Sequence, residues 1–187
     1  MNKEKIWRYS FIIASIGFLG IVILQFLPPL VFHSPVSMKL IKQKAQIESL
    51  DSPEIPDFTI IRKIPTIDFP ESRELIHRKL GRLGYRANFF IELETTMVVK
   101  KSGNYTFYVA SDDGFRLWVD DKMLGEHPYD RGMTTNAMPM FLAEGKHRFR
   151  LKYFQRYSGM GLFAGYQFMD SRRIRPIGLG SKWIRFE

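Results

Sequence analysis

The sequence predicts a mainly β protein, an antiparallel β-sandwich that follows one N-terminal transmembrane helix. Two observations support this fold class. From Tyr85 onward, runs of alternating apolar and polar residues are separated by turns rich in Gly, Asp and Asn, a pattern typical of antiparallel strands. Before them, residues 9–27 contain no charged residue and would form a helix about 28 Å long, close to the ~30 Å hydrocarbon core of a bilayer.

The charges in front of this apolar segment predict its orientation. Residues 1–8 carry Lys3, Lys5 and Arg8 against one acidic residue, so this segment is expected in the cytoplasm and the rest of the chain outside. No cleavage site with small residues follows residues 9–27, which favours an uncleaved anchor over a signal peptide. We therefore expect a single-pass protein of a bacterial inner membrane with a periplasmic or extracytoplasmic C-terminal domain.

The segment that follows is expected to be a linker or stalk over residues 28–57. Residues 36–50 mix apolar residues with lysines and glutamines, which favours a solvated stalk helix, with an amphipathic helix at the membrane surface as the alternative. A further short helix is expected over residues 70–80, where Gly81 and Gly84 would end it.

The sandwich itself is expected over residues 58–170. Its centre is residues 103–122, which predict two strands joined by a polar turn; the first strand is apolar on nearly both faces, as in the middle of a sheet. Residues 145–154 alternate apolar with basic side chains, which predicts a half-buried strand with one basic face. Further strands are expected over residues 88–97, 137–142 and 162–169.

Composition narrows the classes of function. The chain has no cysteine, which excludes disulfides and thiol chemistry. Its net charge is +9, which is compatible with a nucleic acid partner, but the charge is scattered, so a membrane surface or an acidic polymer is at least as good a candidate. We expect no nucleic acid partner, because an exported domain would seldom meet one. The basic tail, residues 171–187, is expected either to pack as a terminal strand or to dock on a partner.

Two motifs carry a resemblance to a known family. They are the run SDDGFRLWVD from Ser111 to Asp120 and the strand GKHRFRLKYF from Gly145 to Phe154. Together with their surroundings, over roughly residues 75–170, they resemble the protective-antigen-type domain, a family named after the anthrax toxin component that includes flocculin-type adhesins. The resemblance implies a β-sandwich and, for the lectin members, calcium-dependent sugar binding.

The resemblance assigns the metal site to Asp112 and Asp113. In the lectin members two adjacent aspartates at this position, joined by a cis peptide, hold Ca²⁺, and paired carboxylates suit an ion that prefers hard oxygen ligands. The lectins add an Asn or Asp from a later loop, but residues 155–161 contain neither. Asp130 and Asn136 are the candidate substitutes. The alternative is that Asp112 and Asp113 only form the turn between two strands.

Exposed aromatic residues in the loops could form a sugar platform. Tyr129 and Tyr157 lie in polar loops and suit stacking on a pyranose ring, whereas Trp118 and Phe163 are more simply explained as core residues. Arg156 places a positive charge in the same loop as Tyr157. The expected ligand-binding residues are therefore Tyr129, Asp130, Asn136, Arg156 and Tyr157, beside a metal pair of Asp112 and Asp113.

Signals of catalysis are missing from the sequence, so no enzyme is expected. The second acidic pair, Asp120-Asp121, is most simply a hairpin turn, and the four histidines show no ligand spacing. The sequence thus predicts a membrane-anchored, extracytoplasmic module that binds a carbohydrate or envelope polymer, with Ca²⁺ as its candidate cofactor. The alternative is a non-catalytic structural subunit of a cell-envelope assembly, held by contacts with another envelope protein.

Overall fold

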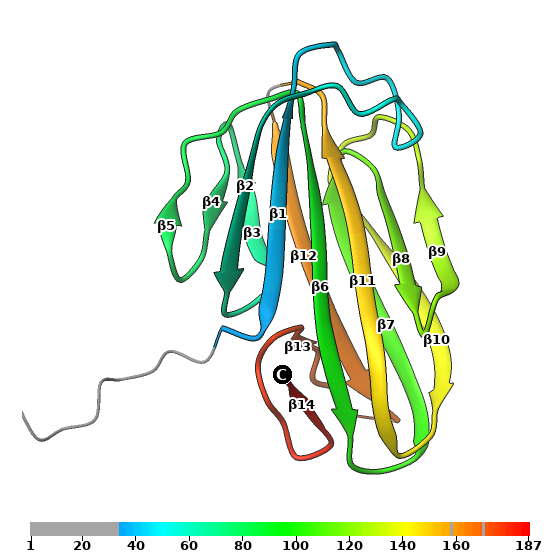
Figure 1. Cartoon of the computed structure of the whole chain (residues 1–187). Helices are drawn as coiled ribbons and strands as arrows, with labels where there is room; N and C mark the ends of the chain where they lie inside the picture. The colour runs from blue at the N-terminus through cyan, green and yellow to red at the C-terminus, as the bar shows by residue number, and fades with distance from the viewer. Residues whose placement is uncertain (1–33, 158, 170) are drawn as a thin grey trace, which may run out of the picture. The chain divides into compact units, whose positions relative to one another are not determined.

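The computed structural model describes residues 34–157, 159–169 and 171–187, which form two antiparallel β-sheets packed face to face (Figure 1). No α-helix occurs among these residues, and none of them belongs to a helix that could cross a membrane. The apolar segment 9–27 and the cytoplasmic segment 1–8 lie outside the described residues. The expectation of an antiparallel sandwich is confirmed.

The strands are, in chain order, β1 (Val36–Gln43), β2 (Pro56–Ile64), β3 (Asp68–Ser72), β4 (Ile76–His77), β5 (Gly81–Arg82), β6 (Phe89–Val99), β7 (Gly103–Asp112), β8 (Phe115–Val119), β9 (Lys122–His127), β10 (Thr134–Leu142), β11 (Gly145–Gln155), β12 (Met160–Phe168), β13 (Arg175–Pro176) and β14 (Ile184–Phe186). The larger sheet has the order β2-β1-β6-β11-β8-β9, with β14 beside β6. The smaller sheet has the order β10-β7-β12-β13, with β3 beside β12, and β4 and β5 form a separate hairpin.

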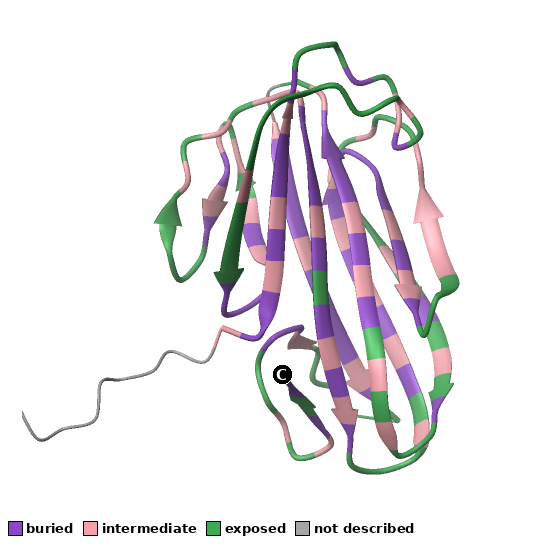
Figure 2. Ribbon diagram, viewed as in Figure 1, coloured by how far each residue is buried: buried purple, intermediate pink, exposed green. Residues whose placement is uncertain are grey.

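The core lies between the two sheets, because each strand turns its apolar side chains inward. Figure 2 shows the resulting bands of buried and partly exposed residues along the strands. Phe107 of β7 and Phe149 of β11 meet across the interface with ring centroids 6.1 Å apart. As predicted, β7 lies in the middle of its sheet, and β11 buries Phe149 while its basic residues take the outer face.

One edge of the long strand β6 is shared by two strands from distant parts of the chain. β1 pairs with β6 over Phe89–Glu94, and β14 pairs with it over Met97–Val99. Ile184 and Phe186 of β14 are completely buried. Of the two expectations for the tail, the structure therefore has the terminal strand, and this strand completes the edge that β1 leaves open.

The expectation of a helix over residues 36–50 is wrong, and the sandwich begins at Val36 rather than at residue 58. Val36, Met38 and Leu40 point into the core, while Lys39 between them pairs with a glutamate of β6 on the outer face. A strand needs apolar residues on one face only, so a segment with several lysines still fits the sheet.

The loop after β1, residues 44–55, covers part of the larger sheet's outer face. Ile47 and Leu50 from this loop pack on Ile41, Phe90 and Phe154, which form a second small core on that face. This segment, expected as linker, is thus a folded part of the domain.

The short helix expected over residues 70–80 is also wrong, because this stretch forms β3 and β4. His77 explains the difference: its ring is fully buried, its Nε2 lies 2.8 Å from the carbonyl oxygen of Thr66, and it meets the ring of Phe69 edge-on. These contacts join segments that a helix would separate, and no local pattern predicts them.

We predict that Phe186→Ala lowers the free energy of unfolding by about 3–5 kcal/mol, because it leaves a cavity in the core. Arg185→Ala in the same strand, whose side chain is exposed, should change it by less than about 0.5 kcal/mol. Urea unfolding measures both. Equal and small effects would mean that β14 does not contribute to the core.

Candidate functional site

The predicted site residues gather at one end of the sandwich, which we call the rim. The rim consists of the β7–β8 turn (Asp112–Gly114), residues 128–133 between β9 and β10, and Arg156, Tyr157 and Gly159 between β11 and β12. These connections lie at the upper end in Figure 1. The β7–β8 and β11–β12 connections both cross from one sheet to the other, so they meet above the core.

The β7–β8 turn is packed tightly against its neighbours. A Cβ atom on Gly114 would lie 2.4 Å from the carbonyl oxygen of His127 and 2.5 Å from the ring of Phe154, so the position requires glycine. The backbone N–H of Phe154 donates to the carbonyl oxygen of Gly114 at 3.1 Å. The hydroxyl of Tyr153 hydrogen-bonds the carbonyl oxygen of Asp112. Two successive residues at the end of β11 thus fix the main chain of this turn.

The two aspartates of the turn differ in their surroundings. Asp113 is only 4% exposed, and its Oδ2 accepts a hydrogen bond of 2.7 Å from the backbone N–H of Arg156. Asp112 is partly exposed, and its Oδ2 lies near Gly159, where an added Cβ would be 3.7 Å from this oxygen. The peptide bond between the two aspartates is cis, which is the geometry that the resemblance implies.

Both carboxyl groups are poorly compensated. Burial raises the pKa of Asp112 to about 6, and the charges of Glu71 and Asp130 act in the same direction. Burial also raises the pKa of Asp113 to about 7, opposed by the Arg156 hydrogen bond and supported by Asp130. Loss of solvent disfavours the charged form of an acid, and a nearby acid adds to the effect. The rim therefore concentrates carboxyl groups whose negative charge would be relieved by a cation.

Asn136, one of the predicted ligand-binding residues, is engaged by Arg131. The Arg131 guanidinium donates to Asn136 Oδ1 at 2.8 Å, to Ser111 Oγ at 2.8 Å and to the carbonyl oxygen of Thr134 at 3.2 Å. It also lies 5.4 Å from the centre of the Phe115 ring. The structure thus uses the Asn136 oxygen to hold an arginine beside Ser111 and does not bring it to the aspartate pair.

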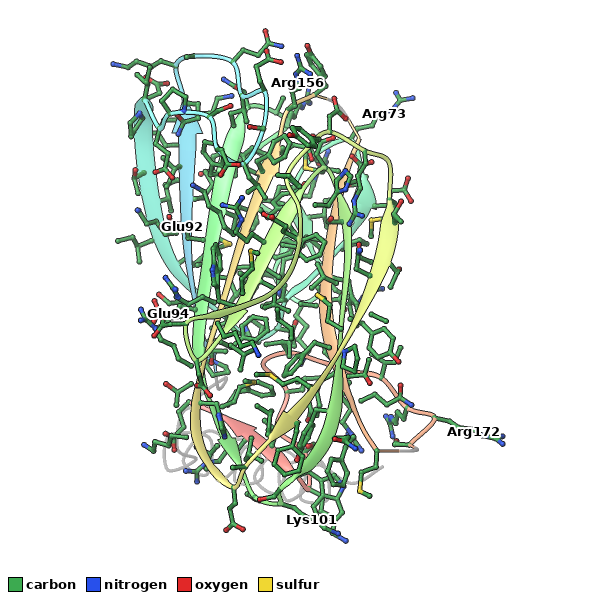
Figure 3. All side chains as sticks on the ribbon, turned by 90° about the vertical axis from the view of Figure 1, so that its right-hand side faces the viewer. Arg73, Glu92, Glu94, Lys101, Arg156 and Arg172 are labelled. Carbon is green, nitrogen blue, oxygen red and sulfur yellow. The ribbon has the colours of Figure 1, made fainter. Side chains whose placement is uncertain are left out.

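Arg156 joins the rim to the loop of residues 44–55. Its guanidinium pairs with Glu48 at 2.5 Å, lies 3.7 Å from Asp130 Oδ2 and covers the Tyr157 ring at 4.7 Å from the centroid. Figure 3 shows Arg156 at this end of the molecule, far from Lys101. Arg156 therefore lies among acidic and aromatic groups, and its backbone rather than its side chain contacts Asp113.

The two predicted tyrosines are exposed at the rim. Tyr129 is 64% exposed and Tyr157 is 53% exposed, and the hydroxyl of Tyr157 accepts a hydrogen bond from Gln46. Trp118 and Phe163 are half-buried. Trp118 lines a groove of about 320 Å³ on the outer face of the larger sheet, where Arg150 lies 5.1 Å from its ring, and so it is neither in the core nor at the rim.

Several rim residues were not predicted from the sequence. Gln155 is 1% exposed, and its side-chain N–H groups donate to the carbonyl oxygens of Tyr157 and Gly159, which shapes the β11–β12 loop. Gln46 and Glu48 reach the rim from a segment expected as a stalk. No sequence motif includes these residues. The position of an amide residue at the end of the strand is the one signal that could have indicated a role for Gln155.

Asp112 and Asp113 provide too few side-chain oxygens to complete the coordination of a metal ion. Within the described ranges, no group of three or more His, Asp or Glu side chains is arranged as a metal site. Two carboxylates alone do not fill the six to eight oxygen positions of Ca²⁺. Any ion at Asp112 and Asp113 would thus need carbonyl, water or ligand oxygens in addition.

The turn at Asp120 and Asp121 is confirmed as a hairpin, with left-handed backbone at both residues (φ 52° and 63°).

The family model of the PA14 domain matches residues 82–167, a range that includes both motifs on which the resemblance was based, Ser111–Asp120 and Gly145–Phe154. The domain has a PA14-like fold. This confirms the resemblance at the level of the fold, without assigning the chain to the protective antigen itself. The PA14-like domain extends beyond the matched residues, because β1 and β14 complete the larger sheet.

Anti-sigma factor proteins and adhesin domains are among the known proteins similar to this chain. The anti-sigma-I factor RsgI3 of Acetivibrio thermocellus is 29% identical over 99 residues, which cover 52% of this chain and 15% of that protein. The structure of an anti-sigma factor domain-containing protein superposes with a TM-score of 0.61 at 21% identity, covering 78% of this chain and 46% of that chain. The epithelial adhesin 9 A domain of Candida glabrata, solved with Galβ1-3GlcNAc, superposes with a TM-score of 0.58 at 11% identity, covering 79% of this chain and 88% of that chain.

We predict that the aspartate pair makes the metal-free protein less stable as the pH rises. Between about pH 4 and pH 7 the folded state holds more protons on Asp112 and Asp113 than the unfolded chain, whose aspartates titrate near 3.8, so the free energy of unfolding falls. With EDTA present, Asp112→Asn/Asp113→Asn should reduce this fall by about 2 kcal/mol, a value discounted for the exposure of Asp112.

The matched control is Asp120→Asn/Asp121→Asn, which changes an adjacent acidic pair in an exposed turn whose left-handed backbone suits asparagine. Urea unfolding across this pH range measures all three proteins. Other titrating groups, such as the buried His77, are common to the wild type and the Asp112/Asp113 variant and cancel in that comparison. Parallel curves for the wild type and the Asp112/Asp113 variant would contradict the assigned pKa directions.

Proposed function

We propose that the rim binds Ca²⁺ through Asp112 and Asp113 and uses the ion to bind a glycan. The observation that carries this proposal is the pair of carboxyl groups with raised pKa values, Asp113 buried and Asp112 partly exposed, because a divalent cation would compensate the charge that burial leaves unpaired. Asp112, the more exposed of the two aspartates, is the proposed point of entry for the ion. Sugar hydroxyls would supply oxygens that the protein lacks.

The glycan would contact the exposed aromatic residues of the rim. Tyr129 and Tyr157 flank the aspartate turn from two loops and offer flat apolar faces with polar edges. Asp130 and Arg156 add charged groups that can hydrogen-bond hydroxyls or the acidic group of a sugar. The glycan complex of the related Candida adhesin domain supports this class of ligand, and the identity of the sugar is open to direct test.

The module is proposed to work outside the cytoplasm, anchored by residues 9–27 in a bacterial inner membrane. The support is the charge-free apolar segment and the basic residues that precede it. A carbohydrate or envelope polymer would meet the rim only in that location. The proposed role is binding without catalysis.

A second candidate function is a structural or interaction subunit of a cell-envelope assembly. It is favoured by the similarity to the anti-sigma factor proteins, of whose lengths this chain covers 15% and 46%. In this case the PA14-like domain would contact another envelope protein. The two functions differ in their dependence on Ca²⁺.

We predict that Ca²⁺ raises the melting temperature of the wild type by several degrees and that the Asp112→Asn/Asp113→Asn variant loses this gain, because the ion binds only the folded pair. Asp120→Asn/Asp121→Asn should keep it. Differential scanning calorimetry with and without EDTA gives the result. A wild-type protein that gains nothing from millimolar Ca²⁺ would contradict the metal-centred function.

We further predict glycan-array binding that requires Ca²⁺. Tyr129→Ala and Tyr157→Ala should each weaken the bound sugar by about fivefold, the scale of one lost aromatic contact, and should leave the Ca²⁺ stabilisation unchanged. Stabilisation by Ca²⁺ without glycan binding, together with recovery of one stoichiometric envelope protein from membranes, would favour the interaction subunit instead.

A further inference from the structure

The end of the sandwich opposite the rim carries a basic and aromatic surface, which we call the basic end: Lys100, Lys101, Lys182 and Trp183. The Nζ atoms of Lys101 and Lys182 lie 5.1 Å and 4.5 Å from the centroid of the Trp183 ring. The backbone N–H of Lys100 donates to the carbonyl oxygen of Trp183 at 2.8 Å. The β6–β7 turn and the segment before β14 are thus held together as one surface.

The surroundings of the basic end add positive charge and apolar area. Arg172 and Arg173 are exposed, and Met169, which lies near Gly103, is 55% exposed. Figure 3 shows Lys101 and Arg172 at this lower end, opposite Arg156. The three lysines and the two arginines form no ion pair with another described residue, whereas Glu187 nearby is already paired with Lys146.

Position along β7 separates this surface from the rim. Lys101 precedes β7 and Asp112 ends it, and ten residues of extended strand span about 30 Å. The domain therefore has the carboxyl pair at one end and, at the other, basic residues that form no ion pair within the described part of the chain. Lysine near tryptophan, with exposed apolar side chains, is the composition of surfaces that rest on anionic lipid headgroups.

The short segment before the sandwich favours the membrane as the partner of the basic end. If residues 9–27 are the anchor, then residues 28–33 connect it to the described domain, and six residues span at most about 20 Å. We propose that the basic end binds the anionic headgroups of the membrane that holds the anchor, so that the rim faces away from the bilayer. This inference rests on the proposed anchor, and it adds a second, electrostatic contact with the lipid.

The test uses the full chain in lipid nanodiscs, because its lack of cysteine permits single-cysteine labelling. Gly180→Cys lies in the same turn as Lys182, and Gly132→Cys lies at the rim; an added Cβ meets no atom within 4 Å at either glycine. A fluorophore at each site is measured against nitroxide-headgroup lipids in neutral discs and in discs with about 30% phosphatidylglycerol.

We predict that the label at position 180 is quenched roughly twofold more in anionic than in neutral discs, and that about 0.5 M NaCl removes the difference by screening. The label at position 132 should stay bright in both. Reversal of the basic end should abolish the difference, whereas the same charge change at the exposed opposite end should not. The reversal is Lys100→Glu/Lys101→Glu/Lys182→Glu, and the control is Lys44→Glu/Arg73→Glu/Arg86→Glu.

Equal quenching at the two positions, or quenching independent of lipid charge, would overturn the proposal. Extraction at alkaline pH tests the anchor separately. If alkaline pH removes the chain from the membrane, the proposed anchor is wrong. Sedimentation of the extracted chain with anionic vesicles then tests whether the basic end binds lipid. Loss of sedimentation on reversal of the three lysines would support the lipid contact without an anchor. Wild-type chain that stays in solution, or binds an acidic polymer in place of the vesicles, would reject it.

Discussion

The site depends on how the β7–β8 turn is held against the end of β11. The turn passes from the smaller sheet to the larger one, and the β11–β12 loop crosses in the opposite direction at the same end. Tyr153, Phe154 and Arg156 bond the turn through a hydroxyl and two backbone N–H groups. Because both crossings lie above the core, the carboxyl group of Asp113 is buried and that of Asp112 is partly buried. Their position is thus a consequence of the sandwich topology.

The folded protein holds the two carboxyl groups of the turn in surroundings that disfavour their charged form, and a bound cation would remove this cost. Raised pKa values for Asp112 and Asp113 mean that the folded protein holds these acids in a less favourable environment than the unfolded chain does. The nearby arginines do not compensate them fully, since Arg131 binds Ser111 and Asn136, and Arg156 binds Glu48. Proteins commonly accept such a loss of stability at functional sites.

The sequence predicted the parts of the fold that local patterns determine. Alternation identified β7 and β11, and the acidic turn at Asp112 followed from the motif and its resemblance. β1 was not predicted as part of the sandwich, and a terminal strand was only one of two expectations for the tail that forms β14, because each strand depends on an edge of β6 that lies about 50 to 90 residues away in the chain. The same limit applies at the rim: Gln46 and Glu48 reach it from the loop after β1, and only the folded arrangement shows that Arg131 engages Asn136.

The most direct test of the central claim is the number of protons released when Ca²⁺ binds. Isothermal titration calorimetry near pH 6.5, in two buffers of different ionisation enthalpy, measures this number. With carboxyl pKa values of about 6 and about 7, binding should release about one proton per ion. Binding heats that are the same in both buffers, or no binding heat at all, would contradict a calcium site made by the two rim aspartates.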